Sequence, residues 1–224
     1  MFPLGDDRIK TRPAVVTWTL IALNVIIYLW DRHGHLLGQS ITFADLAMRP
    51  REVVQAMHPG KDHFALATVF TSMFLHGGFV HIFGNMIFLA VFGAGVEEAF
   101  GSVRFALYYI AWGIAAAAAQ IWVEPNTSIQ ILGASGAIGG VLGAYFLMYP
   151  TSKIELFFLI PLLPTLEVSA WVLLGFWFLY QMLFPQQGVA NWAHGGGFLA
   201  GMLTVLVLGG RSNIFKGREL EYHY

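Results

Sequence analysis

The stretch Gly133-Ala134-Ser135-Gly136 opens an apolar run that continues through residues 137–148 and is followed by Pro150. A polar turn at residues 124–128 precedes it. Small residues on both sides leave the Ser135 hydroxyl uncovered and allow other backbones to approach it closely. Ser135 is therefore either a serine that packs between helices or a nucleophile, and this stretch alone does not separate the two.

The composition predicts a chain that is dissolved in a bilayer. Of its 224 residues, 57% are hydrophobic and 11% are charged, whereas about 25% are charged in a typical soluble domain. The net charge of −1 gives no reason to expect a nucleic-acid partner. With no cysteine present, disulfides, cysteine nucleophiles and thiolate metal sites are excluded.

The apolar runs predict an all-α membrane protein with six transmembrane helices and a long, partly helical first outer loop. Residues 1–13 and 211–224 are predicted tails, and residues 14–210 form the membrane domain. The predicted spans are residues 14–30, 79–95, 103–123, 135–149, 168–184 and 192–208.

The segments between these spans are predicted from their polar and proline residues. Short surface helices are expected around Phe43–Met48 and within Glu52–Met57. Glu97 and Glu98 are expected to follow the second span. Residues 151–166 contain two prolines, so we expect a connector at the membrane surface there and not a span.

The distribution of lysine and arginine predicts the orientation. Six spans place both termini on one side, and the positive-inside rule favours the cytoplasm for that side. A compact chain of this kind predicts the prokaryotic cell (inner) membrane. The eight basic residues then inside are Arg8, Lys10, Arg12, Arg104, Lys153, Arg211, Lys216 and Arg218, and the four outside are Arg32, Arg49, Arg51 and Lys61.

This orientation predicts the depth of several polar side chains in the membrane without reference to any motif. The even-numbered spans run from outside to inside. His81 and Asn85 begin the second span, Ser135 the fourth and His194 the sixth. All four side chains are therefore expected in the outer half of the membrane, where they could meet.

Small residues favour close contact between the fourth and sixth spans, which would bring His194 within hydrogen-bond distance of Ser135. A histidine beside a serine is the minimum for an activated hydroxyl nucleophile. The alternative is that the glycines only pack helices and His194 bonds to a carbonyl. The small residues are Ala193, Gly197 and Gly201 in the sixth span and Gly136, Gly140 and Gly143 in the fourth.

His81 and Asn85 are spaced to share one helical face. Both can donate a hydrogen bond to a developing oxyanion, and the backbone N–H of Ser135 at a helix start can add a third. The alternative is that Asn85 only holds two helices together.

Three stretches together resemble the rhomboid family of intramembrane serine proteases: residues 71–85, residues 133–136 and residues 193–196. Their order, spacing and placement in the spans agree with that family over roughly residues 14–210. The segment Glu155–Pro161 is also similar to the family's segment after its fourth span.

The resemblance implies a rhomboid-like bundle and a serine–histidine dyad that needs no cofactor or metal. Ser135 would be the nucleophile and His194 the general base and acid. His81, Asn85 and the Ser135 N–H would form the oxyanion hole, and His76 would have a structural role. The implied partners are the lipid bilayer and membrane proteins with helix-destabilised transmembrane segments.

The chain departs from the family pattern at two places. Where some members carry a tyrosine four residues after the serine, stacked on the catalytic histidine, this chain has Gly139. Where some carry a Trp-Arg pair in the first outer loop, it has Ala67-Thr68. What orients His194 and what anchors that loop therefore stay open.

The fifth span is rich in aromatic residues that could form a gate for sideways entry of a substrate. The candidates are Trp171, Trp177 and Phe178, and the alternative is that these side chains simply face lipid.

Other functions fit the sequence less well. A zinc protease would need a pattern such as H-E-x-x-H, which does not occur. An aspartyl protease would need two carboxylates within the predicted spans, and the sequence places none securely there. A transporter would be favoured by internal repeats or by ionisable residues at the bilayer midplane, and the sequence shows neither. The main alternative is a catalytically inactive rhomboid-like protein that binds or escorts membrane clients. Such relatives usually lack the serine or the histidine, and this chain has both.

Overall fold

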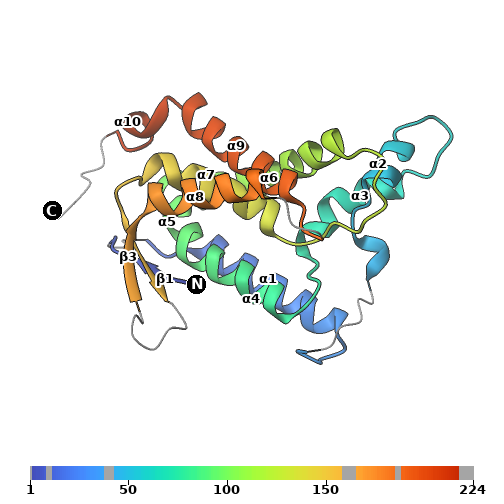
Figure 1. The fold of residues 1–224 in the computed structure, drawn as a ribbon, viewed down its shortest axis with the longest axis horizontal. Coiled ribbons are helices and arrows are strands. Elements are labelled where there is room, and N and C mark those ends of the chain that lie inside the picture. Colours follow the sequence, from blue (N-terminus) through green and yellow to red (C-terminus); the bar gives the residue numbers. More distant parts are fainter. Residues whose placement is uncertain (1, 9–11, 38–42, 158–164, 185–187, 217–224) are drawn as a thin grey trace.

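A computed structural model describes residues 2–8, 12–37, 43–157, 165–184 and 188–216 (Figure 1). The described chain is mostly helical, with a small sheet at one end. The helical elements are α1 (Val15–Asp31), η1 (Ala44–Leu46), α2 (Pro50–Ala56), α3 (Phe64–Thr71), η2 (Ser72–Phe74), α4 (Phe79–Phe88), η3 (Leu89–Gly93), α5 (Ala94–Phe100), α6 (Ser102–Val123), α7 (Ser135–Met148), α8 (Ala170–Leu183), α9 (Asn191–Val207) and α10 (Gly210–Ile214). The strands are β1 (Phe2–Asp6), β2 (Lys153–Phe157) and β3 (Thr165–Ser169).

Helix α7 lies at the centre, and most of its residues are buried. Its small residues let α9 approach until backbones touch. A side chain at Gly197 would collide with the Gly136 carbonyl oxygen, and one at Gly201 would collide with the Gly140 carbonyl oxygen. The predicted close packing of the fourth and sixth spans is confirmed.

The helix that begins at Phe79 is longer than predicted. It runs through α4, the π-helical η3 and α5 to Phe100, so Glu97 and Glu98 lie within it and not after it. Glu97 is buried because its carboxylate accepts hydrogen bonds from the N–H groups of Val16 and Thr17 at the start of α1, at 2.9 and 2.8 Å. This carboxylate therefore pairs with backbone N–H groups at the start of α1 that have no acceptor within their own helix.

A three-stranded antiparallel sheet in the order β1-β2-β3 corrects the expectation of an all-α fold. In Figure 1 it lies at the end of the molecule away from α2 and α3. Strand β2 occupies part of the predicted connector, with Ile154 and Leu156 buried and the alternate residues Lys153 and Glu155 exposed. Pro161 and Pro164, which predicted the connector, lie outside the described residues.

The N-terminal segment, predicted to be a tail, is docked onto α7 as well as paired with β2. Asp6 accepts a hydrogen bond from the Tyr145 hydroxyl at 2.8 Å and also pairs with Arg8. The Arg8 guanidinium lies 3.8 Å from the centre of the Tyr149 ring, where a cation–π contact stabilises it.

The segment predicted to be the first outer loop contains more helix than expected. The helix expected around Phe43–Met48 is the 3-10 turn η1, the one expected within Glu52–Met57 is α2, and α3 was not predicted. Buried Arg32 anchors the loop by donating to the carbonyl oxygen of His76 at 2.8 Å. Arg32, directly after α1, thus ties the end of that helix to the segment just before α4.

The outer surfaces of several helices are apolar. The helices 79–100 and 102–123 are long and apolar enough to cross a membrane, and α1, α7 and α8 are shorter apolar helices. Exposed apolar side chains of this number normally mark contact with lipid or protein. Prominent examples are Trp30, Val103, Leu107, Trp122, Phe176, Leu203 and Val207.

Candidate active site

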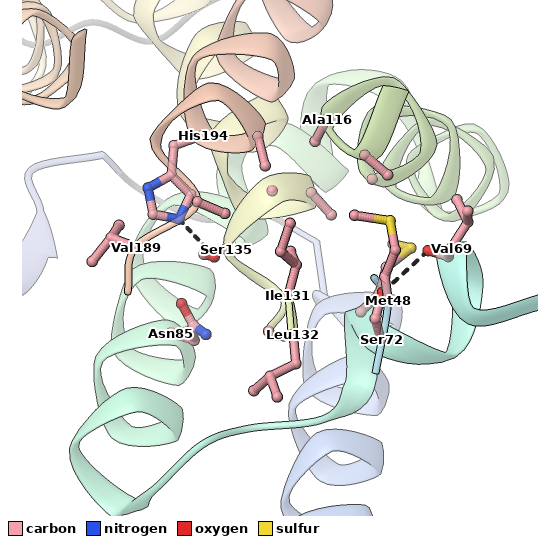
Figure 2. A pocket seen from close by; sticks show the side chains of 18 of the residues that line it. Met48, Val69, Ser72, Asn85, Ala116, Ile131, Leu132, Ser135, Val189 and His194 are labelled. Atoms are coloured by element: carbon pink, nitrogen blue, oxygen red, sulfur yellow. Dashed lines mark hydrogen bonds between the residues drawn. The ribbon is translucent and has the colours of Figure 1, made fainter. Parts of the chain in front are cut away.

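The centre of the site is a hydrogen bond between two helix starts. Ser135 is the first residue of α7, and His194 lies in the first turn of α9. The close contact of these helices places His194 Nε2 2.8 Å from Ser135 Oγ, as Figure 2 shows. The structure thus brings together the two residues predicted to be the nucleophile and the base.

The second ring nitrogen of His194 contacts a residue that the sequence analysis did not identify. His194 Nδ1 lies 3.0 Å from Oε1 of Gln181 on α8. A carbonyl oxygen can only accept, so Nδ1 carries the proton and Nε2 is free to accept the hydroxyl proton of Ser135. The available signal was a single amide side chain in the otherwise apolar run of α8.

His81 and Asn85 face the same space from α4. The N–H of Gly77 donates to His81 Nδ1 at 3.3 Å, which leaves the proton on Nε2 as a donor. Asn85 Nδ2 is buried and makes no hydrogen bond to any described residue. The N–H of Ser135, at the start of α7, has no acceptor within its own helix. Three donors therefore lie near the Ser135 hydroxyl.

Gly133 is required by this arrangement. Its φ of +124° is rarely adopted by residues with side chains, and a Cβ there would lie 2.7 Å from His81 Nε2. Its N–H donates to the Ser72 carbonyl oxygen at 2.9 Å, which fixes the turn before Ser135. Gly133, two residues before Ser135, therefore leaves room for the His81 ring beside the turn.

A cavity of about 390 Å³ connects these groups and is lined by Ser135, His194, His81 and Asn85. The remaining lining is mainly apolar or small; Met48 and Val69 come from the segment between α1 and α4, and Ile131 from the segment before α7 (Figure 2). Within the described ranges, no three His, Asp or Glu side chains are grouped closely enough to hold a metal ion.

The three candidate gate residues occupy different environments on α8. Trp171 is 55% exposed on the outer face. Phe178 stacks on Phe198 of α9 with ring centres 4.8 Å apart, and Trp177 lies between α8 and α9, against His194. Two of the three therefore pack inward.

His76, for which a structural role was predicted, is buried beside His81, with ring centres 5.1 Å apart.

Comparison with known proteins gives independent evidence on the family of this chain. Residues 63–211 match the family model of the Rhomboid domain. The chain is 32% identical over 185 residues to RHOMBOID-like protein 5 of Arabidopsis thaliana, covering 79% of this chain and 53% of that protein.

Two further relatives come from a bacterium and a yeast. Over 139 residues the chain is 34% identical to Rhomboid protease GluP of Bacillus subtilis, covering 62% of this chain and 25% of the relative. Over 208 residues it is 29% identical to Rhomboid protein 1, mitochondrial, of Saccharomyces cerevisiae, covering 87% and 53%. The chain thus spans about half the length of these relatives or less.

Proposed function

The chain belongs to the rhomboid family, and on that premise we propose that it is an intramembrane serine endopeptidase that cleaves transmembrane segments of membrane proteins. The observation that carries the proposal is the 2.8 Å contact between His194 Nε2 and Ser135 Oγ. One relative, Rhomboid protease GluP, is named as a protease, which agrees with the proposal.

The proposed reaction is hydrolysis of a peptide bond through an acyl-enzyme. His194 Nε2 takes the hydroxyl proton as Ser135 Oγ bonds to the scissile carbonyl carbon. The tetrahedral intermediate collapses, the carbon–nitrogen bond breaks, and His194 returns the proton to the leaving amine. A water molecule, deprotonated by the same imidazole, then hydrolyses the ester and regenerates the serine.

The negative oxygen of that intermediate would be stabilised by His81 Nε2, Asn85 Nδ2 and the backbone N–H of Ser135. Each donor would contribute about 3 kcal/mol to the transition state. Asn85 Nδ2 has no partner among the described residues, so it is already available for this role.

Rhomboid proteins are integral membrane proteins, and we propose that this chain crosses the bilayer six times. The spans would be α1, the helix 79–100, α6, α7, α8 and α9, with residues 1–13 and 211–224 in the cytoplasm. The charge distribution supports this orientation. The relatives come from a bacterium, a plant and a yeast mitochondrion, so they do not identify the type of organism.

The short central helix supports a site below the membrane surface. With 14 residues and a rise of about 1.5 Å per residue, α7 is shorter than the roughly 30 Å hydrocarbon core. The start of α7, and with it Ser135, would therefore lie within the bilayer and be surrounded by protein. Substrates with helix-destabilising residues and a small residue before the cut could enter past α8, where Trp171, Trp177 and Phe178 lie.

Cleavage of a single-span test substrate in liposomes tests the proposal against that of an inactive binding protein. The wild type should cleave, Ser135→Ala should lose cleavage by more than 1,000-fold, and exposed Ser212→Ala should keep it. The melting temperature of Ser135→Ala should equal that of the wild type. Binding without cleavage by the wild type would favour the role in which membrane clients are only bound or escorted.

A further inference from the structure

The contact between α7 and α9 prevents position 139 of α7 from supplying a side chain to hold the His194 ring. A Cβ at Gly139 would lie 2.7 Å from the carbonyl oxygen of His194 and 3.3 Å from the amide nitrogen of Phe198. Both atoms are backbone and cannot move aside without separating the helices. A ring at position 139 therefore cannot support the imidazole while the helices are this close.

Helix α8 provides that support through two residues one turn apart. Trp177 and Gln181 share a helical face because they are four residues apart. The Trp177 ring centre lies 5.9 Å from that of His194, with 33° between the planes. Gln181 Oε1 lies 3.0 Å from His194 Nδ1 at the edge of the same imidazole.

We infer that Gln181 is a positioning residue that fixes the tautomer and orientation of His194, an inference that rests on the proposed function of the Ser135–His194 pair. By accepting the Nδ1 proton, Gln181 directs the lone pair of Nε2 toward Ser135. The serine–histidine pair thus has a third member, which is a neutral amide.

The choice of an amide agrees with the surroundings. Gln181 is partly buried on an otherwise apolar helix, where a carboxylate would carry a desolvation cost and an amide accepts the same hydrogen bond without a charge. Among the described residues that line the cavity, the titratable side chains are those of His81 and His194. The amide therefore sets the geometry of the imidazole without adding a charge.

The test compares substitutions that remove or keep the acceptor. Gln181→Met removes it at similar side-chain length, and Gln181→Glu keeps it. Leu183→Met is the matched control, because Leu183 lies on the same helix and is 67% exposed. All variants are purified as the full chain and measured for cleavage and for the rate of labelling by a fluorophosphonate.

Gln181→Met should lower kcat and the labelling rate by about tenfold while KM stays near the wild-type value, because one hydrogen bond is lost. Gln181→Glu should keep most activity and move the acidic limb of its pH–rate profile to higher pH, since a carboxylate favours the protonated imidazole. Leu183→Met should match the wild type. Wild-type labelling by Gln181→Met, or an equal loss in both Gln181 variants, would overturn the inference.

Nitrogen-15 NMR of the His194 ring gives a readout that needs no activity. The wild type should carry its proton on Nδ1, and Gln181→Met should show a population protonated on Nε2. An unchanged tautomer in Gln181→Met would overturn the inference even if activity fell. An inactive wild type with the predicted tautomer change would instead refute the proposed function and leave the role of Gln181 standing.

Discussion

At the scale of single residues, Asn85 separates a catalytic arrangement from a packing arrangement. Its Nδ2 group is buried, lies beside the cavity and makes no hydrogen bond to a described residue. Removing it should therefore cost little folding free energy. If it donates to the oxyanion, the transition state loses about 3 kcal/mol.

Asn85→Ala should lower kcat by about 100-fold, with KM and the melting temperature close to wild-type values. Steady-state cleavage in liposomes and thermal unfolding in detergent measure the two quantities. A lower melting temperature with unchanged kcat would instead identify Asn85 as a residue that only holds helices together.

The sequence predicted that Ser135, His194, His81 and Asn85 would meet, because their positions at the starts of alternate spans put them at one depth. All four line the same cavity. Gln181 could not be predicted in the same way. It lies near the end of α8, and its contact with His194 depends on how α8 rotates about its axis, which the apolar pattern of that helix does not define.

At the scale of elements, the geometry of the site depends on the contact between α7 and α9. Gly201 lies two turns beyond His194, and a side chain there would collide with the Gly140 carbonyl oxygen. Gly201→Ala should push the helices apart and separate His194 from Ser135. Overpacking of this kind costs about 1–3 kcal/mol.

We therefore expect Gly201→Ala to lower the melting temperature and to reduce fluorophosphonate labelling together. Gly175→Ala on α8 is the control, because its Cβ would lie an ordinary 3.5 Å from the Phe146 ring. Normal labelling by Gly201→Ala would show that the α7–α9 contact does not hold the pair in place.

The elements that the sequence did not predict depend on contacts between distant segments. Strand β2 is stabilised by pairing with β1 and β3, which the sequence does not reveal; the two prolines in residues 151–166 predict only a connector. The helix from Phe79 continues past Gly95 because Glu97 is satisfied by the start of α1, whereas a charged pair normally indicates the end of a span. The end predicted from Pro150 agrees better, since the span expected at 135–149 is α7, Ser135–Met148.

At the scale of the whole molecule, the polarity is arranged in the opposite way to that of a soluble enzyme. Large apolar side chains are exposed on α1, α6, α8 and α9, while serine, histidine and asparagine converge on an internal cavity. Membership of the rhomboid family explains both features, because such a protein meets lipid outside and must keep its polar groups inside. The six-span topology and cytoplasmic termini remain predictions from charge and apolar length.

The measurement that tests the central claim most directly is covalent labelling with a fluorophosphonate, followed by mass spectrometry of the labelled peptide. The account predicts one label on Ser135, loss of that label in His194→Ala, and normal labelling in the exposed-histidine control His58→Ala. A label on another serine, or labelling of Ser135 that survives His194→Ala, would contradict the proposal that these two residues form the catalytic pair.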